Sequence, residues 1–161
     1  MSELTDAHLT GLGRVVVNFQ FLEQVTRYAV GTLITPDTLL QGRVVAGMSF
    51  SDLVDLLMRL GHHRFDDQWP PPRQEAFENM LTKLRRAGTR RNDFVHSQWS
   101  SGRLSKIVVR YKESKRAKVA EEVWVTVKDL EDFAELLPNL ALELSDFLDA
   151  DGVDIFASEY T

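Results

Sequence analysis

The sequence predicts a mainly α-helical fold: a bundle of four to five helices with one two-stranded antiparallel β-hairpin inserted before the last helix. Apolar residues recur every three to four positions in the first hundred residues and again in the last third. After Gly102 the period changes to strict alternation, which is typical of strands. A chain of 161 residues with 43% apolar content suits one domain with a single core.

Three helices are expected before the change of period. The first carries an apolar stripe and ends before Pro36, and the second starts with a capping-box-like pair, Ser49 and Asp52. The third follows a run of prolines, of which Pro72 suits a first helical turn. The expected spans are residues 5–34, 49–61 and 72–100.

The alternating segment predicts the hairpin, and a second capping pattern predicts the last helix. Thr126 and Asp129 form that pattern, and Pro138 should kink the helix or start a second segment. The tail is expected to be loosely held. The expected spans are 104–127 for the hairpin, 129–149 for the helix and 150–161 for the tail.

Several classes of protein are excluded or disfavoured by composition. Without cysteine the chain has no disulfide, thiolate zinc site or cysteine nucleophile. No run is long and apolar enough for a membrane helix, and the first residues lack signal-peptide features, so we expect a cytoplasmic protein without membrane contact. The nominal ligands of "HHRFDD" (62–67) match no known metal-site spacing, and no phosphate-binding glycine loop is present. We expect no metal and no cofactor.

The charge is distributed unevenly along the chain. Residues 83–118 hold twelve Lys or Arg against two acids, a net charge of +10, whereas residues 1–82 carry −4 and residues 119–161 carry −11. Such a basic block suggests a surface for an anionic partner. The alternative is that the basic and acidic blocks neutralise each other across the fold.

The basic block contains "RRNDFVHSQW", in which the order of residues is informative. Arg91 falls on the apolar stripe of the third helix, while Asn92 and His96 are four apart and share a face with Trp99. On one ideal helix Arg91 and His96 point about 140° apart. They can face one phosphate only if the helix breaks near residues 87–89 or if a second subunit contributes its own residues.

This pattern resembles the HEPN superfamily, helical-bundle proteins whose ribonuclease members carry an Arg, usually a polar residue next, and a His after four to six intervening residues. Here these are Arg91, Asn92 and His96, and the resemblance extends loosely to "FQFLEQVTRYAV" and "SFSDLVDLL". It implies a homodimer that cleaves RNA without a metal, in a defence or toxin role, with an inhibitory protein as a possible partner. Some relatives carry a modifiable Tyr two residues after the His. Gln98 stands there, which argues against regulation by that route.

The chemistry of RNA cleavage assigns roles to the motif. His96 would act as base or acid, because histidine exchanges protons near neutral pH. Arg91 would hold the phosphoryl oxygens through paired N–H groups, and Asn92 would orient His96 or donate to the same oxygens. With one His per motif, acid and base would be His96 of each subunit. The products would be a 2',3'-cyclic phosphate and a 5'-hydroxyl.

Further residues are candidates for RNA binding, each with a structural alternative. Trp99 could stack on a base or belong to the core, and the cluster around residues 112–118 could follow a phosphate backbone or protect a strand edge. Glu23 could brace Arg91 or pair with Arg27 one turn on. The RNA-binding candidates are Arg86, Arg90, Trp99, Lys112, Lys115, Arg116 and Lys118.

Two hypotheses of function follow. The first is a homodimeric, metal-independent endoribonuclease with Arg91, Asn92 and His96 as its catalytic residues. The second is a catalytically inactive HEPN-like module that dimerises and binds RNA or protein through its basic block, in which His96 only caps a helix end. Substitution of His96 separates them, since only the first hypothesis predicts a cleavage that the substitution abolishes.

Overall fold

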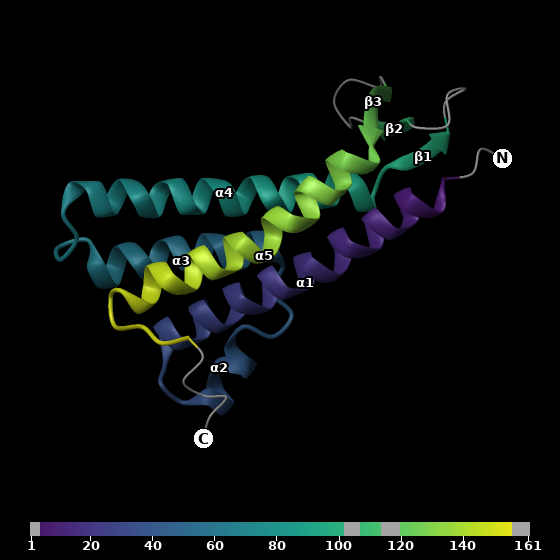
Figure 1. The fold of residues 1–161 in the computed structure, drawn as a ribbon. Helices are drawn as coiled ribbons and strands as arrows, with labels where there is room; N and C mark the ends of the chain where they lie inside the picture. Colours follow the sequence, from purple (N-terminus) through teal and green to yellow (C-terminus); the bar gives the residue numbers. More distant parts are fainter. Residues whose placement is uncertain (1–3, 102–106, 114–119, 156–161) are drawn as a thin grey trace.

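The computed structural model describes residues 4–101, 107–113 and 120–155, and within the sheet the side chains of residues 99 and 123–126 only. The described residues form a helical bundle with a small sheet before the last helix, which confirms the predicted fold class (Figure 1). The elements are α1 (Asp6–Ile34), α2 (Thr38–Val44), α3 (Phe50–Phe65), α4 (Pro71–Val95), β1 (Gln98–Ser101), β2 (Ile107–Glu113), β3 (Ala120–Thr126) and α5 (Val127–Asp149).

The core lies between the four long helices, and its largest contact joins α1 to α5. Gly11 lets the two helices approach, because a Cβ atom there would lie 2.9 Å from the Cβ of Leu130. Asn18 donates a hydrogen bond from Nδ2 to the carbonyl of Ala134, at 2.7 Å. The buried apolar residues among those described form a single cluster. None of the described helices is long and apolar enough to cross a membrane.

The two predicted capping boxes are present at the starts of α3 and α5. Ser49 and Asp52 bond reciprocally at the first, and Thr126 and Asp129 at the second. The helix α5 continues through Pro138 as one element, so a second helical segment does not form there. Buried side chains on both sides of the proline hold the helix together despite the missing N–H group.

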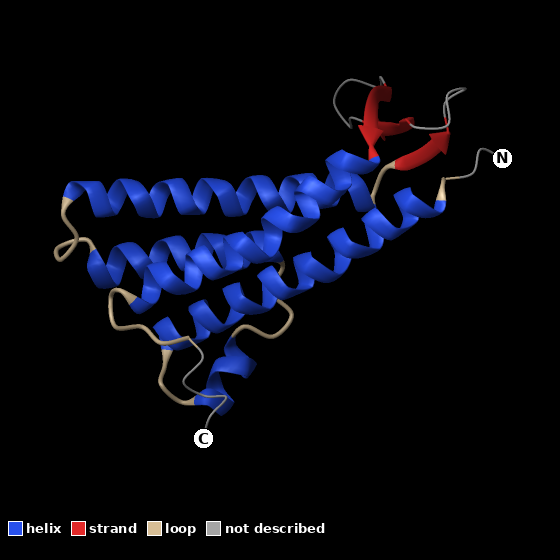
Figure 2. Cartoon of the chain, viewed as in Figure 1, coloured by secondary structure: helices blue, strands red, loops and turns tan. Residues whose placement is uncertain are grey.

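The sheet differs from the prediction. It has three antiparallel strands in the order β1-β2-β3 at one end of the bundle, whereas a two-stranded hairpin was expected (Figure 2). The helix α4 ends at Val95, not near residue 100, and β1 pairs Trp99 with Arg110. The chain turns back because the Trp99 Nε1–H donates to the carbonyl of Phe94 at 2.9 Å and the two rings stack. Four residues are too few to reveal a strand by alternation.

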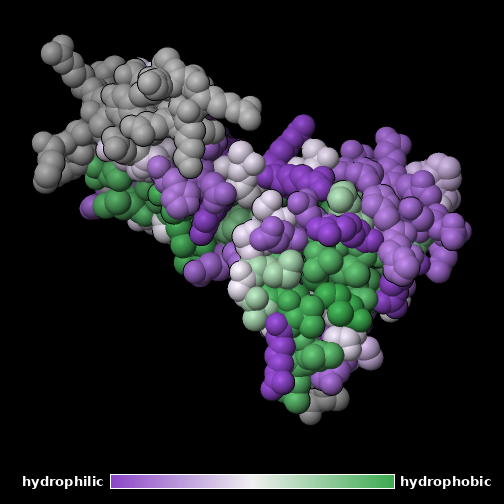
Figure 3. All heavy atoms as spheres, turned by 180° about the vertical axis from the view of Figure 1, so that it is seen from behind, coloured by the Kyte–Doolittle hydropathy of each residue, from purple (hydrophilic) through white to green (hydrophobic). Residues whose placement is uncertain are grey.

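Two helical features were also missed. The helix α2 buries none of its residues and so has no apolar stripe, and its Leu39, Leu40 and Val44 add to the hydrophobic surface, part of which is visible in Figure 3. The helix α3 continues past Gly61 to Phe65 instead of ending at the glycine. Gly61 is a contact point between helices and not a helix end.

The described part of the C-terminal tail is packed, which contradicts the expectation of a loosely held segment. Val153 and Ile155 are buried. Asp151 accepts hydrogen bonds from the Trp69 indole at 3.0 Å and from the Arg73 guanidinium at 2.7 Å. These bonds fasten the tail to the start of α4. The rest of the predicted tail, 156–161, lies outside the described residues.

Candidate functional site

The motif lies at the C-terminal end of α4, which is a single uninterrupted helix from Pro71 to Val95. The proposed break near residues 87–89 is therefore wrong. Gly88 there serves packing, since a Cβ atom would lie 2.9 Å from the Phe50 ring. Contribution by a second subunit stays a prediction.

Arg91 is half-buried and has an unusual environment. Its guanidinium lies over the Phe19 ring, 5.1 Å from the centroid, and Nη1 donates to Asn92 Oδ1 at 3.0 Å. Its Nε is buried and has no hydrogen-bond partner among the described residues. Within the described part of the chain, no carboxylate forms an ion pair with Arg91. The motif thus carries a positive charge that no described acid neutralises.

Glu23 pairs with Arg27, the second of the two alternatives from the sequence, with Oε1 2.6 Å from Nη2. Arg27 is itself held by the carbonyls of Val45 and Met48, each at 2.7 Å. Glu23 nevertheless lines the same pocket as Arg91. The two residues share a cavity without forming an ion pair.

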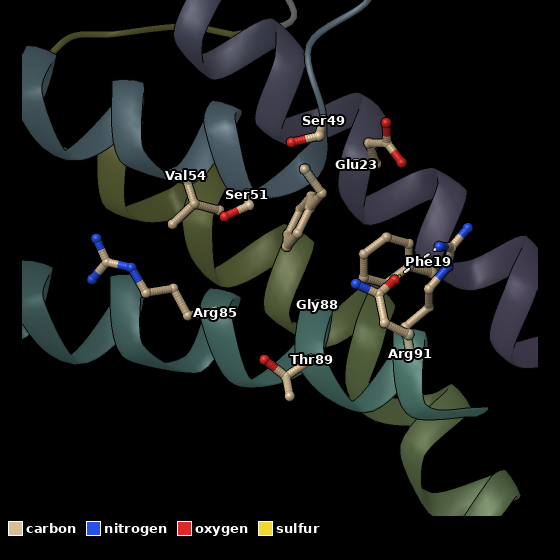
Figure 4. Close-up of a pocket in the computed structure, with 11 residues that line it drawn as sticks. Phe19, Glu23, Ser49, Ser51, Val54, Arg85, Gly88, Thr89 and Arg91 are labelled. Atoms are coloured by element: carbon tan, nitrogen blue, oxygen red, sulfur yellow. Dashed lines mark hydrogen bonds between the residues drawn. The ribbon is translucent and has the colours of Figure 1, made fainter. Parts of the chain in front are cut away.

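This pocket lies between α1, α3 and α4 and has a volume of about 540 Å³ (Figure 4). Phe19 and Glu23 line it from α1, residues 49–51 and 54 from the start of α3, and Arg85, Gly88, Thr89, Arg91 and Asn92 from α4. Sites for small ligands have volumes of about 300–1,000 Å³ and few polar groups on an apolar lining. The pocket has the size of such a site, but its lining is more polar.

His96 is exposed at the C-terminal end of α4, where its backbone N–H donates to the carbonyl of Asn92 at 2.9 Å. It does not line the pocket beside Arg91. One chain therefore brings Arg91 and Asn92 together but leaves His96 outside their pocket. The position of His96 is also the one that the helix-end alternative requires.

Arg86 and Arg90 lie in a groove between α4 and α5, with a volume of about 350 Å³. The Arg90 guanidinium lies 4.7 Å from the Phe133 ring centroid and donates to the Asp129 carbonyl at 3.4 Å. Its charge also lowers the pKa of Asp129, although the hydrogen bonds from Thr126 are the larger cause. The arginines predicted to bind RNA thus occupy a different face of α4 from Arg91.

The remaining candidates fall into two groups. Trp99 is half-buried against the core, and its indole N–H donates to the Phe94 carbonyl. This is the position expected if Trp99 belongs to the core and does not stack on a base. The basic cluster lies outside the description: Lys112 belongs to β2 but its side chain is not described, and residues 115, 116 and 118 are outside the described residues.

Part of the basic block is neutralised by acids, as the alternative interpretation of the charge pattern held. Lys83 pairs with Glu143 of α5 at 2.5 Å, and Arg85 pairs with Asp55 of α3 at 3.1 Å. All four side chains are substantially exposed, so each pair contributes little to stability. Both pairs lie on α4 before Arg91, and neither reaches the motif.

In the "HHRFDD" segment His62 forms ion pairs. His62 Nδ1 and Nε2 lie 2.8 Å from carboxylate oxygens of Asp66 and Glu78. These contacts raise the pKa of His62, the hydrogen bond to Asp66 being the largest cause. No group of three His, Asp or Glu placed to hold a metal occurs among the described residues.

The sequence did not identify the rest of the pocket. Phe19 was expected only as part of the apolar stripe, and Ser51, Thr89 and Arg85 gave no signal, because the pocket joins three helices far apart in sequence. No family model, curated protein or solved structure matches the chain.

Proposed function

We propose that this protein is a metal-independent endoribonuclease that acts as a homodimer, with Arg91, Asn92 and His96 at its active site. The observation that carries the proposal is the state of Arg91: a half-buried guanidinium at an open pocket, bonded to a neutral amide and to no described carboxylate. A charge held in this way costs folding free energy, and an anionic ligand would recover it.

The geometry of Asn92 supports binding of a phosphate. Because Oδ1 accepts from Arg91, the Nδ2 amino group is left to donate elsewhere. The two side chains can present N–H donors to the same phosphoryl group. Donors fixed before the reaction stabilise the negative charge that develops on phosphorus during attack by the 2'-hydroxyl.

His96 supplies the proton transfer in this proposal. It is exposed at the end of α4, where a second subunit can reach it. In a dimer the two motif ends meet, so that His96 of one subunit completes the pocket of the other. One His96 takes the proton of the 2'-hydroxyl, and the other protonates the leaving 5'-oxygen.

The location of His96 also favours the second candidate. Because His96 does not line the pocket with Arg91, the isolated chain has the proposed phosphate-binding residues without the histidine beside them. A binding module that holds RNA and does not cleave it would have this arrangement. The experiment below distinguishes the two functions.

The test is cleavage of a labelled structured RNA in EDTA by the parent protein and its variants. Arg91→Ala and His96→Ala should each lower the rate at least about 100-fold, because each removes a group used in the transition state. Arg14→Ala, an exposed arginine of α1, is the control and should cleave like the parent. Parent products should end in a cyclic phosphate. Binding of RNA by the parent, His96→Ala and Arg14→Ala proteins without any cleavage, together with weakened binding by Arg91→Ala, would establish the binding module instead.

A mixture of the two inactive variants tests the dimer. If Arg91 of one subunit acts with His96 of the other, a heterodimer of Arg91→Ala with His96→Ala contains one site with both residues intact. Regained cleavage in the mixture is the expected result. A mixture that stays inactive, formed from variants shown to exchange subunits, contradicts the shared site.

A further inference from the structure

The pocket beside Arg91 combines groups of opposite charge. Arg91 enters from α4 and Glu23 from α1 on the same side of Figure 4, whereas Arg85 lies at the opposite end along α4. A pocket for an anion alone gains nothing from a carboxylate, because like charges repel. The arrangement fits a ligand that carries both a negative group and hydrogen-bond donors.

Glu23 is a fixed acceptor in this pocket. Its Oε1 is bound to Arg27, whose guanidinium is held by two backbone carbonyls. Its Oε2 accepts no hydrogen bond from another described residue. Because Arg27 balances the charge of Glu23, the free oxygen can accept from a ligand while the phosphate near Arg91 meets little net repulsion.

Aromatic rings also line the pocket. Phe50 is half-buried and packs edge to face on Phe19, with centroids 4.8 Å apart. The exposed hydroxyls of Ser51 and Thr89 also line the pocket. Flat bases of single-stranded RNA stack on aromatic side chains and are recognised through their hydrogen-bonding edges.

We propose that this pocket binds a guanosine nucleotide of the RNA, with the phosphate on Arg91 and Asn92, the base against Phe50, and the Watson–Crick edge on Glu23. Guanine presents two neighbouring donors, N1–H and the N2 amino group, which can bond to Oε2 of Glu23 and to the second lone pair of Oε1, whose first accepts from Arg27. Adenine and cytosine present one amino group each, and uracil places its N–H between two carbonyl oxygens that a carboxylate repels. The inference rests on the proposed function for RNA as the source of the nucleotide.

The experiment is calorimetric titration of the protein with guanosine and uridine monophosphates, which needs no cleavage. The parent should bind the guanosine nucleotide at least about tenfold more tightly, the discrimination expected for a charge-assisted hydrogen bond. Equal affinity for the two nucleotides, or no binding of either, overturns the proposal.

Glu23→Gln tests the residue that recognises the base. The amide has a single acceptor oxygen and adds a donor, so guanosine affinity should fall about tenfold to the level of uridine, with uridine affinity unchanged. Glu143→Gln is the matched control. Glu143 belongs to α5 and also pairs with a basic residue, Lys83, but it lines the groove between α4 and α5 and not the pocket of Arg91. Phe50→Leu should weaken both nucleotides alike. A guanosine preference that survives in folded Glu23→Gln protein overturns the assignment.

Failure of this proposal can be told apart from failure of the proposed function. Selective binding of the guanosine nucleotide by a protein that cleaves no RNA contradicts only the nuclease. Cleavage at all four bases by a protein that does not bind the guanosine nucleotide contradicts only the base site.

Discussion

The two ends of α4 are built in opposite ways. Its N-terminal end, called the closed end, packs Trp69, Arg73 and Phe77 against Phe147 and Asp151. Its C-terminal end, called the open end, carries Arg91, Asn92 and His96 beside Phe19 of α1. Both ends place an arginine against an aromatic ring, but only one of the two arginines has a carboxylate.

At the closed end Arg73 has an aromatic ring, a backbone carbonyl and a carboxylate as partners. The Arg73 guanidinium lies 3.7 Å from the Phe147 ring centroid and bonds both the Phe147 carbonyl and Asp151. Asp151 in turn accepts from the Trp69 indole. The charge of Arg73, its guanidinium plane and its Nη2 donors have partners within the chain, so this end stabilises the fold.

At the open end Arg91 also lies against an aromatic ring, but no described carboxylate pairs with it. Arg91 lies over the Phe19 ring, but its charge faces a neutral amide and a pocket, and its Nε is buried without a partner among the described residues. The difference indicates which arginine serves stability and which is available for binding. Substitutions should therefore cost stability at the closed end and binding at the open end.

The largest loss of stability is expected for Asp151→Ala. The change removes the acceptor of the Trp69 indole and the carboxylate of a largely buried pair, which should lower the free energy of unfolding by about 3 kcal/mol. Urea unfolding measures it. Asp149→Asn is the control, since desolvation and neighbouring acids raise the pKa of Asp149 and its charge does not stabilise the fold. Equal effects of the two changes would contradict the role given to Asp151.

A smaller loss is expected for Gly61→Ala, also at the closed end. The new Cβ atom would lie 2.4 Å from Cζ of the fully buried Phe77, so the ring must shift, at a cost of about 1–3 kcal/mol. Gly13→Ala is the matched control, because a Cβ atom there meets nothing within 4 Å and alanine favours the helix by about 1 kcal/mol. Opposite signs in urea unfolding are the expected result, and a stabilising Gly61→Ala contradicts the packing.

The sequence predicted the long helices and both capping boxes because those signals are local. The capping pairs Ser49–Asp52 and Thr126–Asp129 lie three residues apart. The closed end could not be predicted, since Asp151 lies 82 positions from Trp69 and nothing near either residue indicates the other. The polar partners of the closed end follow only from the tertiary fold.

The candidate site was predictable to the same extent. The stripe of Phe77, Leu84 and Arg91 placed an arginine toward the core, and Arg91 is indeed half-buried. The stripe could not show whether Glu23 would pair with Arg27 or with Arg91, because the sequence allowed both pairs. The structure has the pair with Arg27. Nor could the stripe show that Phe50, from a third helix, would complete the pocket.

A change at the open end should leave stability nearly untouched. Arg91→Met keeps the apolar stem and removes a charge without a described carboxylate, so the free energy of unfolding should change by less than about 1 kcal/mol. Binding of RNA should weaken strongly in the same protein. Urea unfolding and a filter-binding titration measure the two effects. A loss above about 2 kcal/mol would show that Arg91 is a structural brace like Arg73.

The smallest effect is expected from pH at His62, which joins the end of α3 to α4 near the closed end. Contacts with Asp66 and Glu78 raise its pKa above that of the unfolded chain, so its contribution is fully present below about pH 6.5 and is lost as pH rises through the raised value. The side chain is 36% exposed, which limits the contribution to less than about 1 kcal/mol. The difference in unfolding free energy between the parent and His62→Gln should therefore shrink with rising pH. His63→Gln is the control for replacing an exposed imidazole in the same segment. A difference that grows with pH would mean that the contacts of His62 stabilise its neutral form.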